Sequence, residues 1–346
     1  MFGPAAAARA NGLQCKPRAS GNTCCLRVCF LQDRSLLTIT FRGRNLGTSF
    51  MDKPTCICRG YVGETTPAAA QYHCNDFSWE ELRVKAEPLL ASQTTCVSDN
   101  RFVHGSECDS SAWEDFHSAH STARFFKEKR YLVLEFPVLV DQLLTKHVLE
   151  IGSGCGSSLL PVLRENPAAS ATACDVSETA LQLLRDAADR AGICPSRLAT
   201  FAADAAAPEA LARMQQLRAD ACLLVFTLSA VPPGSMRAVL TAAHAALRPG
   251  GLLLFRDYAL YDMSQLRFPP EQRVGERLYR RLDGTLSYYF TAEDLTARAE
   301  EVGFRTVEAS YACVRVRNRR KGLEMDRAFV HGVFKKAGRP EGEGGD

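Results

Sequence analysis

The sequence predicts an α/β protein whose mostly parallel sheet ends in a C-terminal antiparallel hairpin and carries helices on both faces. From about residue 145, short apolar runs alternate with stretches of helical spacing, which is typical of repeated βαβ units. Near the C-terminus, two apolar runs follow one another with no helical stretch between them. Antiparallel strands need only a short connection, so this last pair predicts a hairpin.

Seven apolar runs predict the strands of this sheet in chain order. They cover residues 146–152, 170–176, 197–204, 220–229, 251–258, 307–318 and 328–336. The stretches 178–192, 236–251 and 291–304 have the spacing of amphipathic helices, and the first two end in glycine, a common stop signal. Residues 75–91 predict a short N-terminal helix, and residues 258–290 an irregular insert.

The composition excludes several classes of protein. Apolar residues make up 46% of the chain and charged residues 23%, as in an ordinary globular protein, and no stretch approaches the roughly 20 apolar residues of a membrane helix. The net charge of +3 is too small to indicate a partner. The 14 cysteines are scattered and their spacing matches no zinc site, so we expect reduced thiols and no bound metal.

A glycine-rich loop follows the first predicted strand. Gly152, Gly154 and Gly156 alternate with Ser153 and Cys155, which lets the backbone approach a ligand closely and turn into a helix. The third glycine comes two residues after the second, whereas dinucleotide-binding loops place it three residues after. The loop therefore favours a nucleotide-type ligand that is not a dinucleotide.

Two acids end the next two strands. Asp175 ends the second strand, where its carboxylate can accept hydrogen bonds from both hydroxyls of a ribose. Asp204 ends the third strand, where an adenine would lie beside the backbone N–H of Ala205. Either acid could instead cap the following helix. Their occurrence together with the glycine loop favours a cofactor site. Together these features resemble the seven-stranded, Rossmann-like fold of S-adenosylmethionine-dependent methyltransferases, which implies S-adenosylmethionine as the cofactor.

Longer motifs resemble one branch of that fold, the tRNA N3-methylcytidine methyltransferases. The run from Val225 through RDYALYD (256–262) to LRF (266–268) resembles that family closely. RLDGTLSYYFTAEDL (281–295) and WEDFHSAHSTARFFKEKRYLVLEF (113–136) resemble two further family motifs. The likeness spans about residues 111 to 336 and implies a tRNA (cytidine-N3) methyltransferase.

The resemblance carries site residues over one by one. The cofactor-binding set comprises Trp113, His117, Gly152, Gly154, Gly156, Asp175, Asp204, Ala205 and Val225. His117 replaces the family's tyrosine and lacks its phenol, and Ser157 or Ser158 stands where the family has an asparagine. In the segment that matches the FFKDRH motif, the residues assigned to RNA are Phe125, Phe126, Lys127 and Arg130, the last in place of the histidine.

The insert indicates a nucleic-acid substrate from its residues alone. Arginines and aromatic residues interleave over 256–290, a pattern in which cations meet phosphates and rings stack on unpaired bases. We expect Arg267, Arg280 and Arg281 to contact RNA, and a second basic run at 315–321 to follow its backbone. The alternative, a solvated basic face above core aromatic residues, remains open.

The charged end of the fifth strand predicts the groups that hold the base. Cytosine N3 has a free lone pair once the base leaves its pair, so no proton must be removed before methyl transfer. A carboxylate near the exocyclic amine would offset the positive charge that develops on the ring. We therefore predict Asp257 in this role, Arg256 on the base carbonyl or a phosphate, and Tyr258 stacking on the base or hydrogen-bonding to it.

The resemblance also implies partners. It points to the cytidine at position 32 of the anticodon loop, in tRNAs of the serine, threonine or arginine type. Some members of the family need a protein partner such as seryl-tRNA synthetase. Two other functions remain open for this chain: methylation of a small molecule or protein by the same fold, and RNA binding without catalysis.

These features divide the chain into four parts. Residues 1–74 are rich in Arg and small residues and poor in acids, which predicts a transit segment or a disordered leader. Residues 75–144 are expected to form a helical segment covering substrate and cofactor, 145–336 the methyltransferase domain with the insert at 258–290, and 337–346 a flexible tail. We expect a cytoplasmic protein, or a mitochondrial or other organellar one if 1–74 is a transit peptide, and no membrane association.

Overall fold

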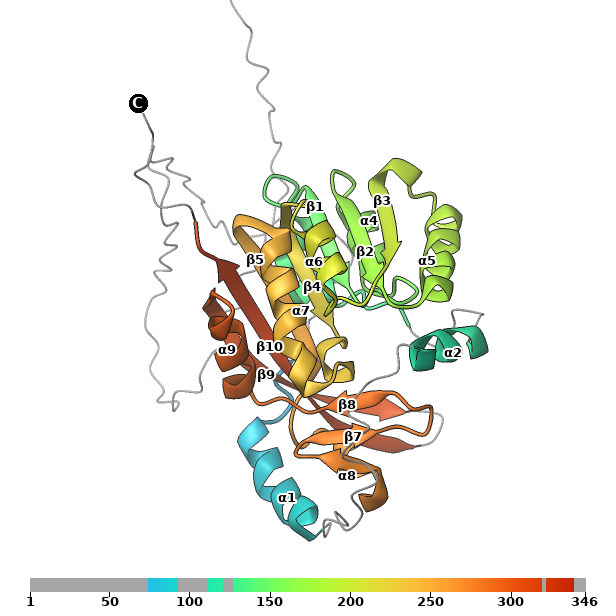
Figure 1. Cartoon of the computed structure of the whole chain (residues 1–346). Coiled ribbons are helices and arrows are strands. Elements are labelled where there is room, and N and C mark those ends of the chain that lie inside the picture. The colour runs from blue at the N-terminus through green and yellow to red at the C-terminus, as the bar shows by residue number, and fades with distance from the viewer. Residues whose placement is uncertain (1–73, 93–110, 121–126, 319–321, 339–346) are drawn as a thin grey trace, which may run out of the picture. The chain divides into compact units, whose positions relative to one another are not determined.

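The computed structural model describes residues 74–92, 111–120, 127–318 and 322–338, and all of them lie in one compact unit, Thr66–Asp346 (Figure 1). Several sequence predictions fall outside the described residues. These are the leader up to residue 73, the tail from residue 339, and the RNA candidates Phe125 and Phe126.

A seven-stranded sheet forms the centre of this unit. Its strands are β1 (His147–Ile151), β2 (Ser170–Asp175), β3 (Leu198–Ala202), β4 (Ala219–Val225), β5 (Leu247–Tyr258), β9 (Phe304–Asn318) and β10 (Leu323–Lys336). Their spatial order is β3-β2-β1-β4-β5-β10-β9, with β1 to β5 parallel and β10 antiparallel to both of its neighbours. The predicted fold class, including the closing hairpin, is confirmed.

The order of the strands decides where a ligand can bind. From β1 the chain moves outward to β2 and β3, and then returns to the other side of β1 with β4 and β5. β1 and β4 therefore pair directly, with Ile151 opposite Leu224 at their carboxyl ends. Helical connections leave such a switch point in opposite directions, which opens a crevice at that edge of the sheet.

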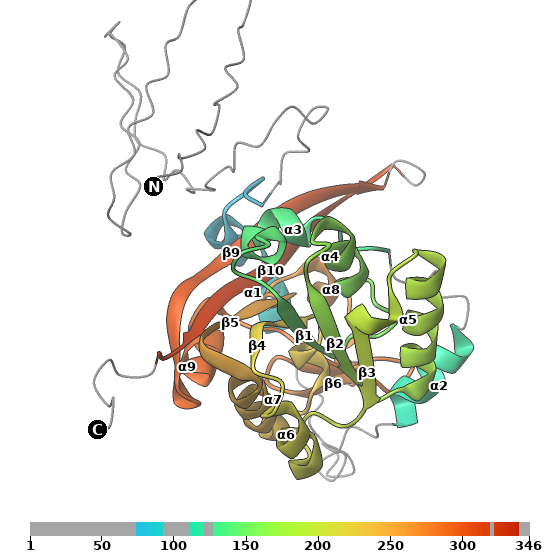
Figure 2. The same cartoon turned by 90° about the horizontal axis from the view of Figure 1, so that it is seen from above.

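Helices cover both faces of the sheet, as Figure 2 shows from above. The helices of the described chain are α1 (Trp79–Ser92), α2 (Ser111–Ala119), α3 (Leu132–Glu135), α4 (Leu159–Glu165), α5 (Glu178–Arg190), α6 (Pro208–Met214), α7 (Pro233–Ala246), α8 (Met263–Leu266) and α9 (Ala292–Glu301). Short 3₁₀ turns add η1 (Pro137–Val140), η2 (Pro195–Arg197), η3 (Leu228–Ala230) and η4 (Pro270–Gln272).

Each face of the sheet has its own apolar core. Successive strand residues point to opposite faces, so Val148 packs with α4 and α5 while Leu149 packs with α6, α7 and α9. Both side chains are fully buried. This explains why the central parallel strands β1, β2 and β4 are continuous apolar runs, since a sheet covered on both faces buries almost every position of its inner strands.

The insert after β5 is ordered where the sequence predicted irregular structure. It contains α8, η4 and a separate antiparallel sheet of three short strands, β6 (Arg273–Gly275), β7 (Leu278–Arg280) and β8 (Leu286–Tyr288). We refer to these three strands and their turns, residues 273–288, as the small sheet. Strands of three residues are too short to show an alternating pattern, which is why they could not be predicted from the sequence.

The hairpin of β9 and β10 extends past the strand beside it. β10 pairs with β5 only over Phe329–Lys335, whereas β9 and β10 pair over almost their whole length. The chain before α1 lies along the extension, where the Asp76 amide donates to the Cys313 carbonyl at 2.9 Å. The Trp79 ring then stacks on Tyr311 at 4.3 Å. The N-terminal helix predicted at 75–91 is thus found at Trp79–Ser92.

Candidate active site

The glycine loop after β1 adopts backbone conformations that favour glycine. Gly152, Gly154 and Gly156 have φ angles of +71°, +51° and +83°. A Cβ atom on Gly152 would fall on the Thr227 side chain, and one on Gly156 on the Leu184 side chain. The loop is therefore packed tightly between the end of β4 and α5.

Asp175 ties the loop to the end of β2. Its carboxylate accepts hydrogen bonds from the Gly154 amide at 2.7 Å and from the Ser177 amide at 3.0 Å. The residue is buried, and burial raises the pKa of its carboxyl despite these bonds. Such a carboxylate still has lone pairs for a polar ligand, such as a pair of ribose hydroxyls.

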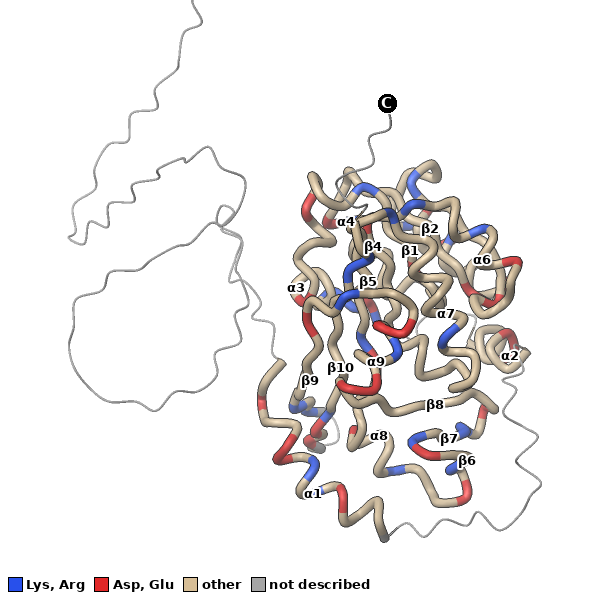
Figure 3. The backbone as a smooth tube through the Cα atoms, turned by 60° about the vertical axis from the view of Figure 1, so that its left-hand side comes forward, with Lys and Arg blue, Asp and Glu red and all other residues tan. Residues whose placement is uncertain are grey.

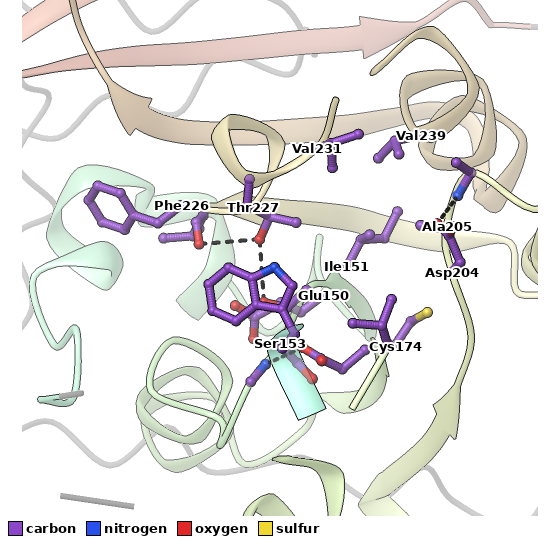
Figure 4. Close-up of a pocket in the computed structure, with 18 of the residues that line it drawn as sticks. Glu150, Ile151, Ser153, Cys174, Asp204, Ala205, Phe226, Thr227, Val231 and Val239 are labelled. Carbon is purple, nitrogen blue, oxygen red and sulfur yellow. Dashed lines mark hydrogen bonds between the residues drawn. The ribbon is translucent and has the colours of Figure 1, made fainter. Parts of the chain in front are cut away.

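A pocket of about 800 Å³ lies at the carboxyl ends of β1, β2 and β4 (Figure 4). Asp204 and Ala205 lie at one end, Phe226 at the other, and Glu150 and Ser153 between them. The volume and the elongated arrangement suit a ligand the size of a nucleoside with an extension.

Eight of the nine predicted cofactor residues line this one pocket. They are Trp113, His117, Gly152, Gly154, Asp175, Asp204, Ala205 and Val225. Gly156 lies outside the lining. The Leu184 side chain packs against it, in the space that a Cβ atom would need. The nine residues come from α2, the glycine loop and the ends of three strands, so the fold brings them together from positions as far apart as 113 and 225.

The pocket also contains polar residues that were not assigned from the sequence, and three of them are Glu150, Ser153 and Lys129. Glu150 and Ser153 are buried, and neither Glu150 Oε2 nor Ser153 Oγ has a hydrogen-bond partner among the described residues. Lys129 Nζ lies in the same pocket and donates to Ser157 Oγ. Burial raises the pKa of Glu150 to about 7 and lowers that of Lys129.

These three residues fit a zwitterionic ligand. Buried polar atoms without partners are costly unless a ligand satisfies them. An amino group suits Glu150, and a carboxylate suits Ser153 and Lys129. The signal for Glu150 was present in the sequence, since it is the acid at the end of the first strand, just as Asp175 and Asp204 end the second and third.

The end of β5 differs from the prediction for two of its three residues. Tyr258 lines the pocket, whereas Arg256 and Asp257 do not. Arg256 Nη1 donates to Glu135 Oε1 at 2.6 Å, and its guanidinium carbon lies 4.4 Å from the centre of the Phe329 ring. Arg256 is therefore placed to hold α3 against the sheet and not to grip a base.

Asp257 is fully buried on the other face of β5. Its carboxylate accepts hydrogen bonds from the Ser229 amide at 2.9 Å and the Tyr258 amide at 2.8 Å. Ser229 belongs to η3, and the residues that follow it, from Ala230 on, line the pocket. The structure thus assigns Asp257 to the support of a pocket loop in place of the predicted contact with the amine of the base.

Replacement of Asp257 with asparagine should flatten the dependence of stability on pH. Burial raises the pKa of Asp257 to about 6, above its ordinary value of about 4. The folded protein therefore binds this proton more tightly than the unfolded chain, so the stability it contributes is complete below about pH 4 and is lost as pH rises through about 6. As pH rises through this range, the free energy of unfolding is therefore expected to fall by about 3 kcal/mol less in Asp257→Asn than in the wild-type protein.

Urea unfolding of both proteins at pH 4, 5, 6 and 7 measures this difference. Asp115→Asn, at an exposed carboxylate on α2, controls for the loss of one charge. Parallel pH profiles for the wild-type protein and Asp257→Asn would contradict the assignment.

Aromatic rings and guanidinium groups surround Tyr258. Its ring lies 5.0 Å from that of Phe226 and 5.8 Å from that of Tyr289. The guanidinium carbons of Arg281 and Arg327 lie 6.0 and 5.9 Å from the ring centre. Phe226 also has a φ of +56°, a strained conformation of the kind that concentrates at functional sites. The Phe226 end of the pocket thus meets the small sheet.

The predicted RNA contacts lie in different settings. Lys127, Arg130 and Arg267 are exposed, and Arg130 pairs with Glu128 at 3.1 Å. Arg280 Nη1 donates to the Gly284 carbonyl at 3.4 Å, and Arg281 donates to neutral oxygens of Thr285, Leu286 and Ser287. Figure 3 shows the basic residues of the small sheet.

The second basic run, residues 315–321, is less available for binding phosphates than its sequence indicated. Arg315 pairs with Asp326 at 2.7 Å, and Arg317 pairs with Glu324, so both guanidinium groups meet carboxylates across the hairpin. Arg319, Arg320 and Lys321 lie outside the described residues. In the described part of the chain, no cluster of His, Cys, Asp and Glu is arranged to hold a metal ion, and no helix has the length and apolar character to cross a membrane.

The fold and the pocket define a class I methyltransferase that uses S-adenosylmethionine. A methyltransferase domain family matches residues 120–309, more than half of the chain. Among solved structures, an S-adenosylmethionine-dependent methyltransferase from Anabaena variabilis has a TM-score of 0.50 at 15% identity, over 66% of this chain and 94% of the other. This likeness shows the fold.

More specific relatives narrow the family. The tRNA N(3)-cytidine methyltransferase METTL6 of Homo sapiens is 34% identical over 261 residues, which cover 74% of this chain and 90% of that protein. The tRNA N(3)-methylcytidine methyltransferase Mettl2 of Drosophila melanogaster is 31% identical over 266 residues, covering 74% and 81%. The chain belongs to the tRNA N(3)-cytidine methyltransferase family, and the resemblance found in its motifs is confirmed.

Proposed function

We propose that this protein transfers a methyl group from S-adenosylmethionine to N3 of a cytidine in tRNA. The observation that carries the proposal is the position of Tyr258, which lines the cofactor pocket and also contacts the aromatic and basic residues of the insert. A base stacked at this end would lie next to the cofactor, while the rest of the RNA meets the small sheet. Membership of the family supports the choice of cytidine.

The pocket residues divide among the parts of the cofactor. Asp175 would hold the ribose, Asp204 and Ala205 the adenine, and Glu150 and Ser153 the amino and carboxylate groups of the methionine end. When bound, the cofactor supplies a methyl group on a sulfonium, already activated for transfer. The chain need only place an acceptor in line with that methyl group and exclude water.

No proton transfer is required before methylation, because N3 of an unpaired cytosine carries a lone pair. The chain's task is to hold the base outside its stack. The rings of Tyr258 and Phe226 offer aromatic surfaces for it at the Phe226 end of the pocket. Arg281 is bonded to neutral oxygens, so its positive charge can serve a phosphate of the same nucleotide.

Finer points of the substrate extend this proposal. The target is the cytidine at position 32 of the anticodon loop, in tRNAs of the serine, threonine or arginine type, and an aminoacyl-tRNA synthetase such as seryl-tRNA synthetase assists in presenting it. The protein works in the cytoplasm, or in mitochondria or another organelle if residues 1–74 act as a transit peptide.

Methylation of defined tRNAs tests the proposal. Purified protein is incubated with S-adenosylmethionine and unmodified serine, threonine or arginine tRNA, with and without seryl-tRNA synthetase, and the nucleosides are analysed by mass spectrometry. We expect 3-methylcytidine in at least one tRNA, and none in its matched control with uridine at position 32. The affinity for the tRNA should fall steeply with salt, since phosphates supply much of the binding energy.

Two outcomes would oppose the proposal in different ways. Formation of 3-methylcytidine in the position-32 control would leave the reaction intact but move its target. Absence of 3-methylcytidine from all tRNAs, in a protein that binds S-adenosylhomocysteine, would favour a small-molecule or protein substrate, or a non-catalytic RNA-binding protein.

A further inference from the structure

We propose that Glu114 is a positioning residue of the cofactor site, which holds α2 over the pocket by accepting hydrogen bonds at the N-terminus of α5. The inference rests on the cofactor and does not depend on the RNA substrate. It concerns a residue that contacts neither, and that acts through its neighbours Trp113 and His117.

Glu114 meets the first turn of α5. The Thr179 hydroxyl donates to Glu114 Oε1, and the Thr179 amide donates to Oε2 at 3.4 Å. The N-cap residue Ser177 satisfies the next amide, that of Ala180, at 3.0 Å. Amides in the first turn of a helix have no partner within the helix, and the helix dipole favours a negative charge there. Glu114 therefore acts as a capping acid supplied by a different helix.

The bonds to Thr179 also keep Glu114 ionised. Its pKa is lowered chiefly by the hydrogen bond from the Thr179 side chain. A charged acceptor makes a stronger bond than a neutral one, so the link between the two helices is a charge-assisted pair. Figures 1 and 2 both show α2 beside one end of α5.

A neighbouring face of α2 lines the cofactor pocket. Residues four apart lie one above the other on a helix, so Trp113 and His117 share a face, and both line the pocket. His117 lies directly over the glycine loop, with Cε1 3.7 Å from where a Cβ atom on Gly154 would stand. Burial lowers the pKa of His117, so this ring covers the loop in its neutral form. A shift of α2 would move both rings relative to Gly154.

Apolar packing alone gives α2 little support. His117 is the only buried residue of this nine-residue helix. Helices of this length are not stable by themselves and depend on contacts with the rest of the protein. The two hydrogen bonds from Thr179 to Glu114 therefore hold α2 in place, because its apolar packing contributes little. The N-cap residue of α5, Ser177, lies two residues after Asp175, so the bonds tie α2 to the end of β2, which carries the proposed ribose-binding carboxylate.

Binding of S-adenosylhomocysteine by calorimetry tests the inference without any RNA. Glu114→Ala is the main variant, because alanine preserves the helical propensity of α2. We expect its affinity for S-adenosylhomocysteine to fall about 10-fold. Thr179→Val removes the partner hydroxyl and should weaken binding in the same direction. The double variant should be no weaker than the worse single variant, since the two residues act through one contact.

Asp115→Ala is the matched control, because it removes the adjacent and exposed carboxylate of the same helix. Its affinity should stay within about twofold of the wild-type value. Loss of the capping bonds is expected to lower the melting temperature of the ligand-free protein by only a few degrees. A purely structural role for Glu114 would cause this shift but leave the affinity of the folded protein for S-adenosylhomocysteine unchanged. Equal affinities in Glu114→Ala and Asp115→Ala, or fully additive effects of Glu114→Ala and Thr179→Val, would overturn the proposal.

Discussion

Replacement of Arg256 with methionine is expected to lower the free energy of unfolding by about 3–5 kcal/mol. The side chains of Arg256 and Glu135 are 4% and 1% exposed, and the two are joined at 2.6 Å. Methionine keeps most of the side-chain volume but leaves the Glu135 carboxylate in the interior without its cation. His331 Nδ1, at 2.9 Å from the same oxygen, could supply a charge only by taking up a proton.

The size of this loss in the free energy of unfolding distinguishes an Arg256 that supports the fold from an Arg256 that binds the base. Urea unfolding, with the slope checked for two-state behaviour, measures it. Arg315→Met is the matched control, since its pair with Asp326 is partly exposed and should contribute less than about 1 kcal/mol. In the double variant Arg256→Met/Glu135→Leu, an apolar pair replaces the charges and much of the stability should return. A loss below about 1 kcal/mol in Arg256→Met would restore Arg256 as a candidate for contact with RNA.

Alanine at position 152 is expected to weaken S-adenosylhomocysteine binding by about 100-fold. Gly152 has a φ of +71°, which is unfavourable for residues with a Cβ atom, and the new methyl group would fall on Thr227. Either the loop or the end of β4 must move, and both line the pocket. A local cost of about 3 kcal/mol in the geometry of the site corresponds to this change in affinity.

Gly192→Ala provides a matched control for the backbone strain. Gly192 has a φ of +69° and lies after α5, and no described atom comes within 4 Å of the place that a Cβ atom would take there. The variant should lose stability comparably to other alanine substitutions at positive φ, and bind S-adenosylhomocysteine normally. Calorimetry measures the affinity of both variants for S-adenosylhomocysteine. Equal affinities of Gly152→Ala and Gly192→Ala would show that strain in the glycine loop does not affect cofactor binding.

The sequence could predict which residues gather in the pocket because their signals are local. A strand end followed by a glycine loop or an acid occupies a few neighbouring residues, and the rule for parallel sheets brings those ends to one edge. Gly152, Asp175 and Asp204 could therefore be placed together from their positions in the chain. Lys129 could not, because nothing in its own segment indicates that it enters the pocket.

The surroundings of the predicted base-holding residues could not be derived from the sequence, because strand partners are distant in the chain. Charges at the end of β5 were expected to face the substrate, yet Arg256 meets Glu135, 121 residues earlier, and His331 on the neighbouring strand. Successive residues of a strand also point to opposite faces, so Arg256, Asp257 and Tyr258 could not all face one ligand. Of these three, Tyr258 alone lines the pocket.

The chain before α1 covers part of an edge of the central sheet. β9 is the last strand of the sheet, and a long edge strand offers free backbone groups to which a foreign strand can add. Residues 74–76 occupy part of that edge, where the Cys313 amide donates to the Cys74 carbonyl at 2.6 Å and the Asp76 side chain accepts from the Arg315 amide. These backbone groups of β9 are therefore already paired within the chain and are not available to a strand of another molecule.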